Sequence, residues 1–413
     1  MSAAVFVSTR VMESRDCQSS PWLHRFAVLT ALATLGLIGI GGLVTSHEAG
    51  MSVPDWPTSY GYNMFALPFR FWKGGVFYEH THRLWATVVG TMVVVLVRWA
   101  GGRGSRKPMA LLGVVETLAG AALLLAPAEL RSTGHFLMGI GGVVVLAALV
   151  PFRGEAVDRV TVRLCWVAFG LVQVQGLLGG LRVVLLRDAI GILHAALAQA
   201  FFALLCVVAV RTGGRWRDWL AQGARPATPG ARAAVVAATV LIFGQLILGA
   251  SMRHQHAGLA VPDFPLAYGR LWPAADAGSI ERYNAQRVEV MAANPITAFQ
   301  VELHMAHRVG AVVIVGLIFW SARLLGRGPD MRLRRLGRAW MGLVLLQALL
   351  GAATVWSNKA ADLATAHVLT GALLLAMGLI LCIMVSISLK TERTARVLAG
   401  GVRVPQGATS AAA

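Results

Sequence analysis

Charged residues are scarce in this chain of 413 residues: they make up 14%, and 19 Asp and Glu stand against 37 Lys and Arg. A soluble domain carries about 25% charged residues, so the composition excludes an ordinary soluble globular protein. Apolar residues reach 56%, which is typical of a protein embedded in a lipid bilayer. The net charge of +18 is spread over short segments between apolar runs, so it does not form the basic face of a nucleic-acid-binding protein.

Cysteine is also rare, with four residues in the chain. Cys17 lies in the N-terminal segment, and the other three lie within or near apolar runs. This distribution excludes a disulfide pair in an outer loop. The first 26 residues include two acidic residues, and no small-residue cleavage site follows the first apolar run. We therefore expect no removable signal peptide, and the first apolar helix is retained.

Apolar runs of about 20 residues, the length of a membrane-spanning helix, recur along the chain. The sequence predicts an all-α polytopic membrane protein with about ten transmembrane helices. The expected spans are 27–46, 79–97, 109–126, 134–151, 164–181, 190–210, 233–251, 298–320, 339–356 and 364–388.

The distribution of basic residues predicts the orientation of these spans. The short segment 323–338 carries six Lys and Arg, whereas the long segment 252–297 carries four. Because cytoplasmic loops are enriched in Lys and Arg, we expect both termini to be cytoplasmic in a bacterial inner membrane. The cytoplasmic parts are then the N-terminal segment 1–26, the linker 211–232 and the tail 389–413.

An internal repeat organises the chain, which is a common result of duplication in membrane proteins. Three motifs recur in the same order, each followed or preceded by an apolar run. The matched segments are HEAGMSVPDWP at 47–57 with HAGLAVPDFP at 256–265, EHTHR at 79–83 with HMAHR at 304–308, and QGLLGG at 175–180 with QALLGA at 347–352.

The repeat predicts two homologous four-helix bundles in tandem. The halves are 27–210 and 233–388, and both begin inside, so they are parallel copies whose equivalent residues lie at equal depth. The helix pair at 109–151 has no counterpart in the second half. We interpret it as an insertion that leaves the orientation of the later helices unchanged.

Four histidines stand out, because each lies in the first turns of an expected helix that runs from outside to inside: His82, His194, His307 and His367. Binding of a haem by two histidines requires two imidazoles at one depth on facing helices, with small residues beside them. One pair in each half meets this depth condition, His82 with His194 and His307 with His367. A zinc site would need a third ligand at tight spacing, which we do not find. A single intramembrane histidine can instead bond a neighbouring helix, but four at equivalent positions indicate function.

Other polar residues near these histidines have two interpretations each. Arg83 and Arg308 directly follow a histidine, where they are candidates either for haem propionate contacts or for contact with lipid phosphates. Glu79 is one turn from His82; it is a candidate catalytic carboxylate or a charge near a helix N-terminus. His135, in the inserted pair, is a rival ligand to His194, which we prefer because the preceding segment matches the second half.

With these residues in place, the sequence resembles the haem A synthase family. The resemblance rests on Glu79, on the four histidines, on the two arginines and on the paired loops, and it extends over most of the chain. The family oxidises the C8 methyl of haem O to the formyl group of haem A. The resemblance implies a resident haem b held by His307 and His367, and a substrate haem O held by His82 and His194, with Glu79 assisting stepwise electron withdrawal and water addition. Members often carry an outer-loop cysteine pair, which this chain lacks.

The same resemblance implies partners in addition to the bilayer, namely a haem O synthase or terminal oxidase assembly factors, and an electron acceptor of unspecified kind. Two other functions are compatible with the motifs. One is a di-haem electron-transfer or quinone-reacting subunit, which Glu79 disfavours; the other is a transporter, for which no broken helix pair is seen. The loops that carry Trp56 and Phe264 either anchor at headgroup depth or roof the haem pockets.

Overall fold

The computed structural model describes residues 21–151, 157–223, 227–286 and 295–401. Within these residues the chain forms α-helices and short 3-10 turns, with no strand, so the expected all-α fold is confirmed. The α-helices are α2 (Pro21–Ser46), α3 (Gly75–Leu124), α4 (Ala128–Leu149), α5 (Arg159–Leu185), α6 (Asp188–Thr212), α7 (Gly214–Ala221), α8 (Ala231–His254), α9 (Ala277–Ala285), α10 (Ala298–Arg327), α11 (Met331–Trp356) and α12 (Ala361–Gly401).

Nine of the described helices are long and apolar enough to span a membrane. Ten spans were expected, and the difference lies in α3, whose 50 residues contain 79–97 and most of 109–126. The chain bends sharply at Gly102, where φ is 52° and ψ is −139°. Such a conformation is open to glycine and strained for other residues. Arg98 fixes the bend by donating from Nη1 to the Gly102 carbonyl at 2.6 Å.

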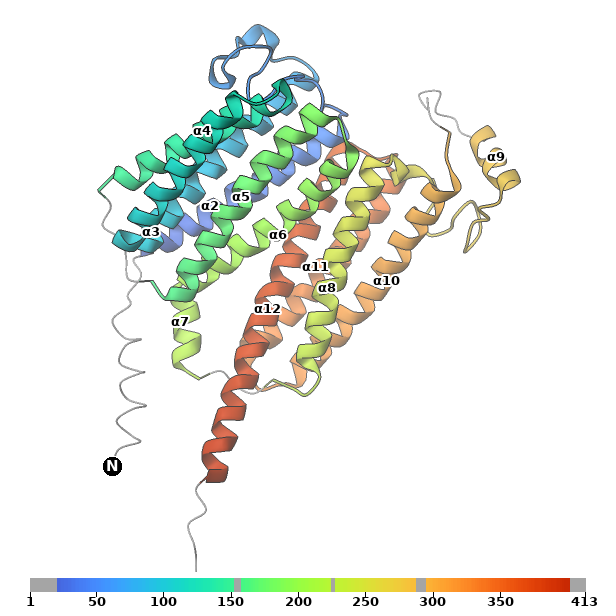
Figure 1. Cartoon of the computed structure of the whole chain (residues 1–413). Coiled ribbons are helices and arrows are strands. Elements are labelled where there is room, and N and C mark those ends of the chain that lie inside the picture. Colours follow the sequence, from blue (N-terminus) through green and yellow to red (C-terminus); the bar gives the residue numbers. More distant parts are fainter. Residues whose placement is uncertain (1–20, 152–156, 224–226, 287–294, 402–413) are drawn as a thin grey trace, which may run out of the picture.

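Eight helices form two four-helix bundles (Figure 1). In the first, α2 packs on α3 and α6, and α5 packs on the same two helices. In the second, α8 packs on α10 and α12, and α11 packs on the same two helices. The bundles meet where α2 and α6 contact α12, and where α6 contacts α8. Two tandem bundles are therefore present, as the repeat predicts.

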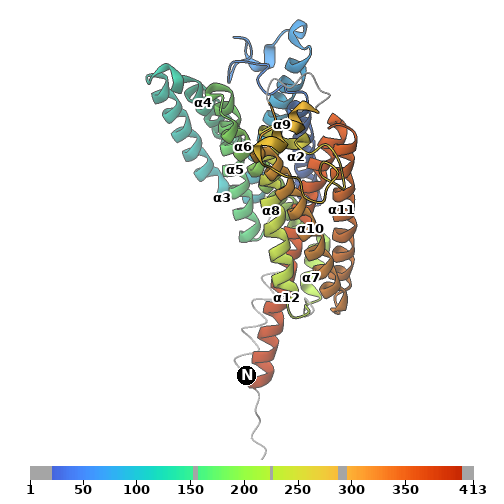
Figure 2. The ribbon, with the colours of Figure 1, turned by 90° about the vertical axis from the view of Figure 1, so that its right-hand side faces the viewer.

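The two helices of the inserted pair pack closely, because glycines of each helix face the backbone of the other. A Cβ on Gly113 would lie 2.7 Å from the Gly141 carbonyl oxygen, and one on Gly120 would lie 2.6 Å from that of Gly134. Small residues at such a crossing let two backbones approach each other in a bilayer. Figure 2 shows the pair α3 and α4 at one edge of the molecule, away from α11.

Several boundaries differ from the expected ones. The first helix begins at Pro21, inside the segment 1–26. Residues 1–20, which include Cys17, lie outside the described part of the chain. The linker 211–232 contains α7, an amphipathic helix that buries Trp216 and Trp219. The helix α12 continues beyond 388 into the segment 389–413. These differences arise because apolar run length marks the membrane-spanning part of a helix and not its polar extensions.

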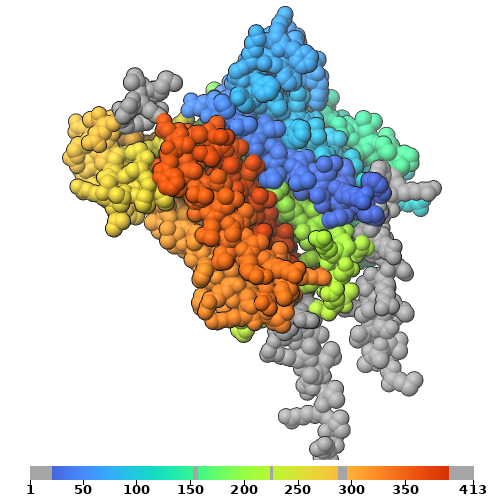
Figure 3. All heavy atoms as spheres, turned by 180° about the vertical axis from the view of Figure 1, so that it is seen from behind, coloured from blue at the N-terminus to red at the C-terminus, as the bar shows by residue number. Residues whose placement is uncertain are grey.

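One arginine ties the bundles together near the end that carries the loops 47–74 and 255–297, which we call the outer end. Arg253 at the end of α8 donates from Nη2 to the Gly42 carbonyl at 2.8 Å and to the Ser46 hydroxyl at 2.7 Å. Seen from behind in Figure 3, α2 lies directly beside the second half, which forms one continuous body with the first. The termini of the described chain lie at the opposite end (Figure 1).

Candidate functional site

Two outer loops of the same shape cover the bundles. Asp55 accepts hydrogen bonds from the backbone N–H groups of Tyr60 at 2.6 Å and Gly61 at 2.8 Å. Asp263 accepts from Tyr268 at 2.7 Å and Gly269 at 2.8 Å. Both tyrosines have φ of 52°. The matched VPD motifs therefore fold into matched turns, which an aspartate stabilises by bonding the backbone ahead of it.

Each turn is held to its bundle by the arginine that follows a histidine. Arg83 donates to the carbonyl oxygens of Val53 at 2.9 Å, Asp55 at 2.7 Å and Thr58 at 3.1 Å. Arg308 does the same to Val261 at 3.3 Å, Asp263 at 2.7 Å and Leu266 at 2.9 Å. The guanidinium donors that were candidates for propionate contacts are thus largely bound to loop carbonyls, and the propionate role of both arginines stays a prediction.

Glu79 and His304 occupy equivalent positions, and each accepts a hydrogen bond from the outer loop of its own half. The carboxylate of Glu79 accepts from the Val53 N–H at 2.8 Å and pairs with Arg83 at 2.7 Å. The Val261 N–H donates to Nδ1 of His304 at 3.3 Å. Both side chains are almost fully buried, at 4% and 3% exposure. Each anchors the first residue of a VPD motif, and the difference between the halves is a carboxylate in the first and an imidazole in the second.

The four candidate haem ligands share a common seat. The Cε1 of each imidazole rests against a glycine on a neighbouring helix, so that a Cβ on that glycine would lie within 3.0 to 3.4 Å. The pairs are His82 with Gly41 of α2, His194 with Gly179 of α5, His307 with Gly249 of α8, and His367 with Gly351 of α11. Gly41 and Gly249 are equivalent in the repeat, as are Gly179 and Gly351. The two halves therefore build the same seat twice.

The second-half pair has the spacing of two ligands to one iron. The ring centroids of His307 and His367 are 6.4 Å apart, with an angle of 62° between the ring planes. An imidazole nitrogen binds a metal ion at about 2 Å, so two imidazoles on opposite sides of one ion have centroids about 6 Å apart. The residues present therefore fit a haem between α10 and α12.

In the first half, His82 and His194 come from α3 and α6, which both pack on α2 and α5. The Nδ1 atoms of His82, His194 and His307 are buried, and none meets a hydrogen-bond partner among the described residues. A buried ring nitrogen without a partner is costly. Such rings are suited to a group that binds them, which is what a haem iron does.

Glutamines one turn before three of these glycines form hydrogen bonds with the histidines through main-chain carbonyl groups. The side-chain amide of Gln175 donates to the His194 carbonyl at 3.0 Å, and that of Gln245 donates to the His307 carbonyl at 2.7 Å. The Nδ1 of His367 lies 3.1 Å from the carbonyl oxygen of Gln347. This last contact fixes the proton on Nδ1 and leaves Nε2 as the metal-binding nitrogen.

The loop aromatics lie beside the pockets. Trp56 packs directly on Gly180, because a Cβ there would fall 2.1 Å from its ring, and its ring centroid is 4.8 Å from that of Phe136. Phe264 lies 6.0 Å from the ring of Trp356, whose Nε1 donates to the Phe264 carbonyl at 3.1 Å. Both aromatics thus cap the outer ends of α5 and α11, the helices whose glycines seat a histidine.

The remaining histidines lie elsewhere. His135 is exposed on α4 and bonds the Arg131 carbonyl of its own helix at 2.8 Å, so it does not face His82. His47 bonds the Leu43 carbonyl and stacks on Tyr78 with centroids 4.2 Å apart. His254 packs on Gly191, and His256 lies 3.7 Å from the Glu48 carboxylate.

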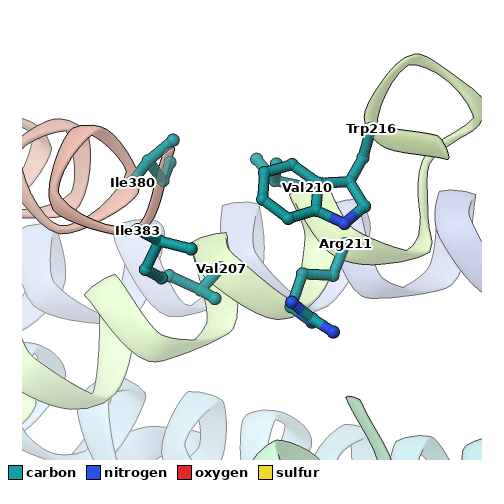
Figure 4. Close-up of a pocket in the computed structure, with 6 residues that line it drawn as sticks. All are labelled: Val207, Val210, Arg211, Trp216, Ile380 and Ile383. Carbon is teal, nitrogen blue, oxygen red and sulfur yellow. The ribbon is translucent and has the colours of Figure 1, made fainter. Parts of the chain in front are cut away.

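A small recess at the inner end is unrelated to these sites. It lies between α6, α7 and α12, where Trp216 stacks near the Arg211 guanidinium (Figure 4). Its lining is otherwise aliphatic and holds no histidine or carboxylate. We assign it no chemistry.

Sequence reasoning did not single out the glycine seats, although their signal was present. Gly179 and Gly351 lie inside the matched QGLLGG and QALLGA segments, and Gly41 and Gly249 each lie 12 residues before the valine of a VPD motif. The contact partners of these glycines lie on other helices, so only the packed structure identifies them.

The chain resembles known proteins in sequence. A family model described as cytochrome oxidase assembly protein (COX15-CtaA) matches residues 131–379, more than half of the chain. The chain is similar to the heme A synthase of Symbiobacterium thermophilum, with 31% identity over 198 residues, which are 46% of this chain and 56% of that relative. The similarity thus spans little more than half of that relative's length. On the family match, this chain belongs to the cytochrome oxidase assembly proteins of that description.

Proposed function

We propose that the chain is a haem A synthase, which converts the C8 methyl of haem O to a formyl group in the first bundle and holds a resident haem b in the second. The observation that carries the proposal is the duplicated seat: two half-buried imidazole pairs, each resting on two glycines, at the same end of two equivalent bundles. The name of the Symbiobacterium thermophilum relative supports the same assignment.

The two bundles differ where a substrate site and a resident site should differ. The first places the Glu79 carboxylate one turn from His82, whereas the second places the neutral ring of His304 there. Conversion of a methyl to a formyl group takes its oxygen from water and releases four protons and four electrons, so a base near the reacting carbon is needed. Glu79 is the buried carboxylate in this position.

The residues have separate tasks in this scheme. His82 and His194 hold the substrate iron, and His307 and His367 hold the iron of the resident haem, which when bound supplies one-electron transfer. The Val53 N–H and Arg83 orient the Glu79 carboxylate. Trp56 on Gly180 excludes water and lipid from the outer side of the first pocket. Proton acceptance by Glu79 then requires only that one of its two hydrogen bonds shift.

One observation favours the alternative of a di-haem electron carrier. Glu79 already bonds a loop amide and an arginine, and its counterpart His304 bonds the same loop position without any carboxylate. Glu79 would then be a structural tie in the first bundle, and neither haem would be altered.

Extraction of the haems separates the two functions. The full chain is co-expressed with a haem O source, purified and extracted, and the haems are resolved by chromatography. Haem A or its alcohol intermediate in the extract supports the synthase, whereas haem b alone, with haem O present in the membranes, contradicts it. A His194→Ala variant is the matched control, since it should lose haem O and haem A together and keep haem b.

A further inference from the structure

We infer that Arg182 binds the propionate carboxylates of the porphyrin in the first pocket, and thereby sets which edge of the macrocycle faces outward. This inference rests on the proposed function, which places a porphyrin between His82 and His194. The evidence is the position of Arg182, the space made for its guanidinium and the lack of a partner for that guanidinium among the described residues.

Arg182 lies on the correct face at the correct height. It is in the last turn of α5, three residues after Gly179, the glycine that seats His194. Residues three apart share a helix face, so Arg182 stands one turn nearer the outer end than the ligand. Its Nε would lie 2.9 Å from a Cβ on Gly191, which is three residues before His194 on α6 and therefore on the same helix face, one turn nearer the outer end. The guanidinium therefore lies at the outer rim of the space between the two imidazoles.

Two glycines make room for this guanidinium. A Cβ on Gly50 would lie 2.8 Å from Nη1 of Arg182, and a Cβ on Gly191 would lie 2.9 Å from its Nε. Gly50 belongs to the outer loop and Gly191 to the first turn of α6, the helix that carries His194. Any larger residue at either position would push Arg182 out of the rim.

The N–H donors of the Arg182 guanidinium are available to a ligand. Arg83 and Arg308 donate to loop carbonyls. The main-chain carbonyl of Arg182 accepts from the Leu186 N–H, but its half-buried guanidinium forms no hydrogen bond or ion pair with any of the residues that the structure describes. An arginine offers five N–H donors in a planar fork that matches a carboxylate. A porphyrin propionate is the carboxylate that a ligand between these imidazoles would bring.

The second bundle lacks this residue. The position equivalent to Arg182 is Thr354, whose hydroxyl bonds the Leu350 carbonyl at 2.8 Å. The loop glycine equivalent to Gly50 is Gly258, and a Cβ there would lie 3.7 Å from Cδ of Lys359. The two rims therefore differ, with a rigid bidentate fork at the first and a flexible single ammonium at the second.

Anchoring of a propionate has a chemical consequence for the proposed reaction. In haem O the C8 methyl and one propionate are substituents of the same pyrrole ring. A fork that fixes that propionate also fixes the methyl, and keeps it on the outer side of the pocket, where Glu79 lies.

The test is an absorption titration of the purified full chain, which carries its resident haem, with ferric haem b and with haem b dimethyl ester. The dimethyl ester retains the iron and loses both propionate charges. We expect the wild-type chain to bind free haem about tenfold more tightly than the ester, because a charge-assisted hydrogen bond is lost. Arg182→Gln should remove this preference, Arg182→Lys should keep part of it, and Arg187→Gln, an exposed arginine in the next turn, should keep all of it.

A preference for free haem that survives in Arg182→Gln would overturn the inference. The low-spin absorption of the resident haem reports whether each variant is folded. If the glutamine variant is not folded, the lysine variant, which preserves the charge, is tested in its place. Failure of the proposed function would give a different experimental result. In that case, the wild-type chain binds no second low-spin haem, or His194→Ala leaves such binding unchanged.

Discussion

The glycine under each imidazole is the residue on which ligand geometry depends most. A leucine in place of Gly351 would meet the His367 ring, whose Cε1 is 3.1 Å from the Cβ position. We predict that Gly351→Leu displaces His367 and removes at least half of the low-spin absorption of the resident haem. The measurement is the reduced-minus-oxidised spectrum of the purified protein.

Gly342 on the same helix provides the control. A Cβ there meets nothing within 4 Å, and the position is exposed. Gly342→Leu should therefore leave the spectrum as it is. An equal loss of low-spin absorption in both variants would mean that α11 tolerates no leucine at either glycine. The contact between Gly351 and His367 would then have no special role.

Glu79 is the residue on which the proposed chemistry depends. In Glu79→Gln the amide oxygen still accepts from Val53, so the loop stays in place, but no base remains. We predict that haem O stays bound while formyl formation falls by about a hundredfold or more, the usual loss with a general base. Chromatography of extracted haems measures both quantities. The control is Glu302→Gln, an exposed carboxylate on α10; normal haem A content in Glu79→Gln would remove Glu79 from the mechanism.

At the scale of elements, the outer turns are held by arginine and aspartate. Arg308 donates to three carbonyl oxygens of the second turn. Its replacement by Gln leaves three carbonyl acceptors without this donor, two of them in part-buried bonds, at a cost of roughly 1–3 kcal/mol. We predict a lower melting temperature and faster proteolysis within 257–286 for Arg308→Gln, but not for Arg270→Gln, whose exposed side chain makes no contact of this kind. Equal protease sensitivity in the two variants would contradict the clamp.

The first turn is expected to depend on pH through Asp55. Burial raises the pKa of the Asp55 carboxyl, but hydrogen bonds from Thr58, Gly61 and Tyr60 outweigh burial and hold the pKa below the ordinary value of 3.8. The carboxylate therefore stabilises the turn above that value, and the stabilisation is lost as the pH falls through the lower pKa of the folded state. Proteolysis within 51–73 should accelerate on acidification below pH 3.8 in the wild type. In Asp55→Asn it should be fast at every pH, and a pH dependence equal to the wild type's would refute the role of this carboxylate.

The sequence predicted the helices better than their ends. Apolar run length predicted ten spans, because this signal acts within one segment. Eight of them coincide with one helix each, and the other two fall in the single helix α3, so the described residues contain nine candidate membrane helices. The bend at Gly102, the helix α9 and the extension of α12 were not anticipated, because polar helical residues carry no membrane signal.

The same distinction holds at the candidate site. The repeat singled out the four histidines, but not the partners that seat them. The occupation of Arg83 and Arg308 by loop carbonyls depends on how the turns fold back over the bundles, which no local pattern encodes. Arg182 was overlooked because the second half has Thr354 at the equivalent position, so the repeat does not mark it.

At the scale of the whole molecule, the orientation in the membrane is the prediction on which the site's location depends. The outer loop exposes Phe69 at 84%, and α7 ends at the exposed Gln222 at the other end of the bundles. We predict that Phe69→Cys in intact cells reacts with a membrane-impermeant maleimide, whereas Gln222→Cys reacts only after permeabilisation. The reverse pattern would place the haem sites on the cytoplasmic side.

The account as a whole depends on one claim, that each bundle binds one iron porphyrin between its two imidazoles. The most direct test is to measure haem content and low-spin absorption of the full chain, co-expressed with a haem O source, for the wild type, His194→Ala and His367→Ala. We predict two haems per wild-type chain, loss of only haem O and haem A in His194→Ala, and loss of only haem b in His367→Ala. A haem content that is the same in all three proteins would contradict the claim.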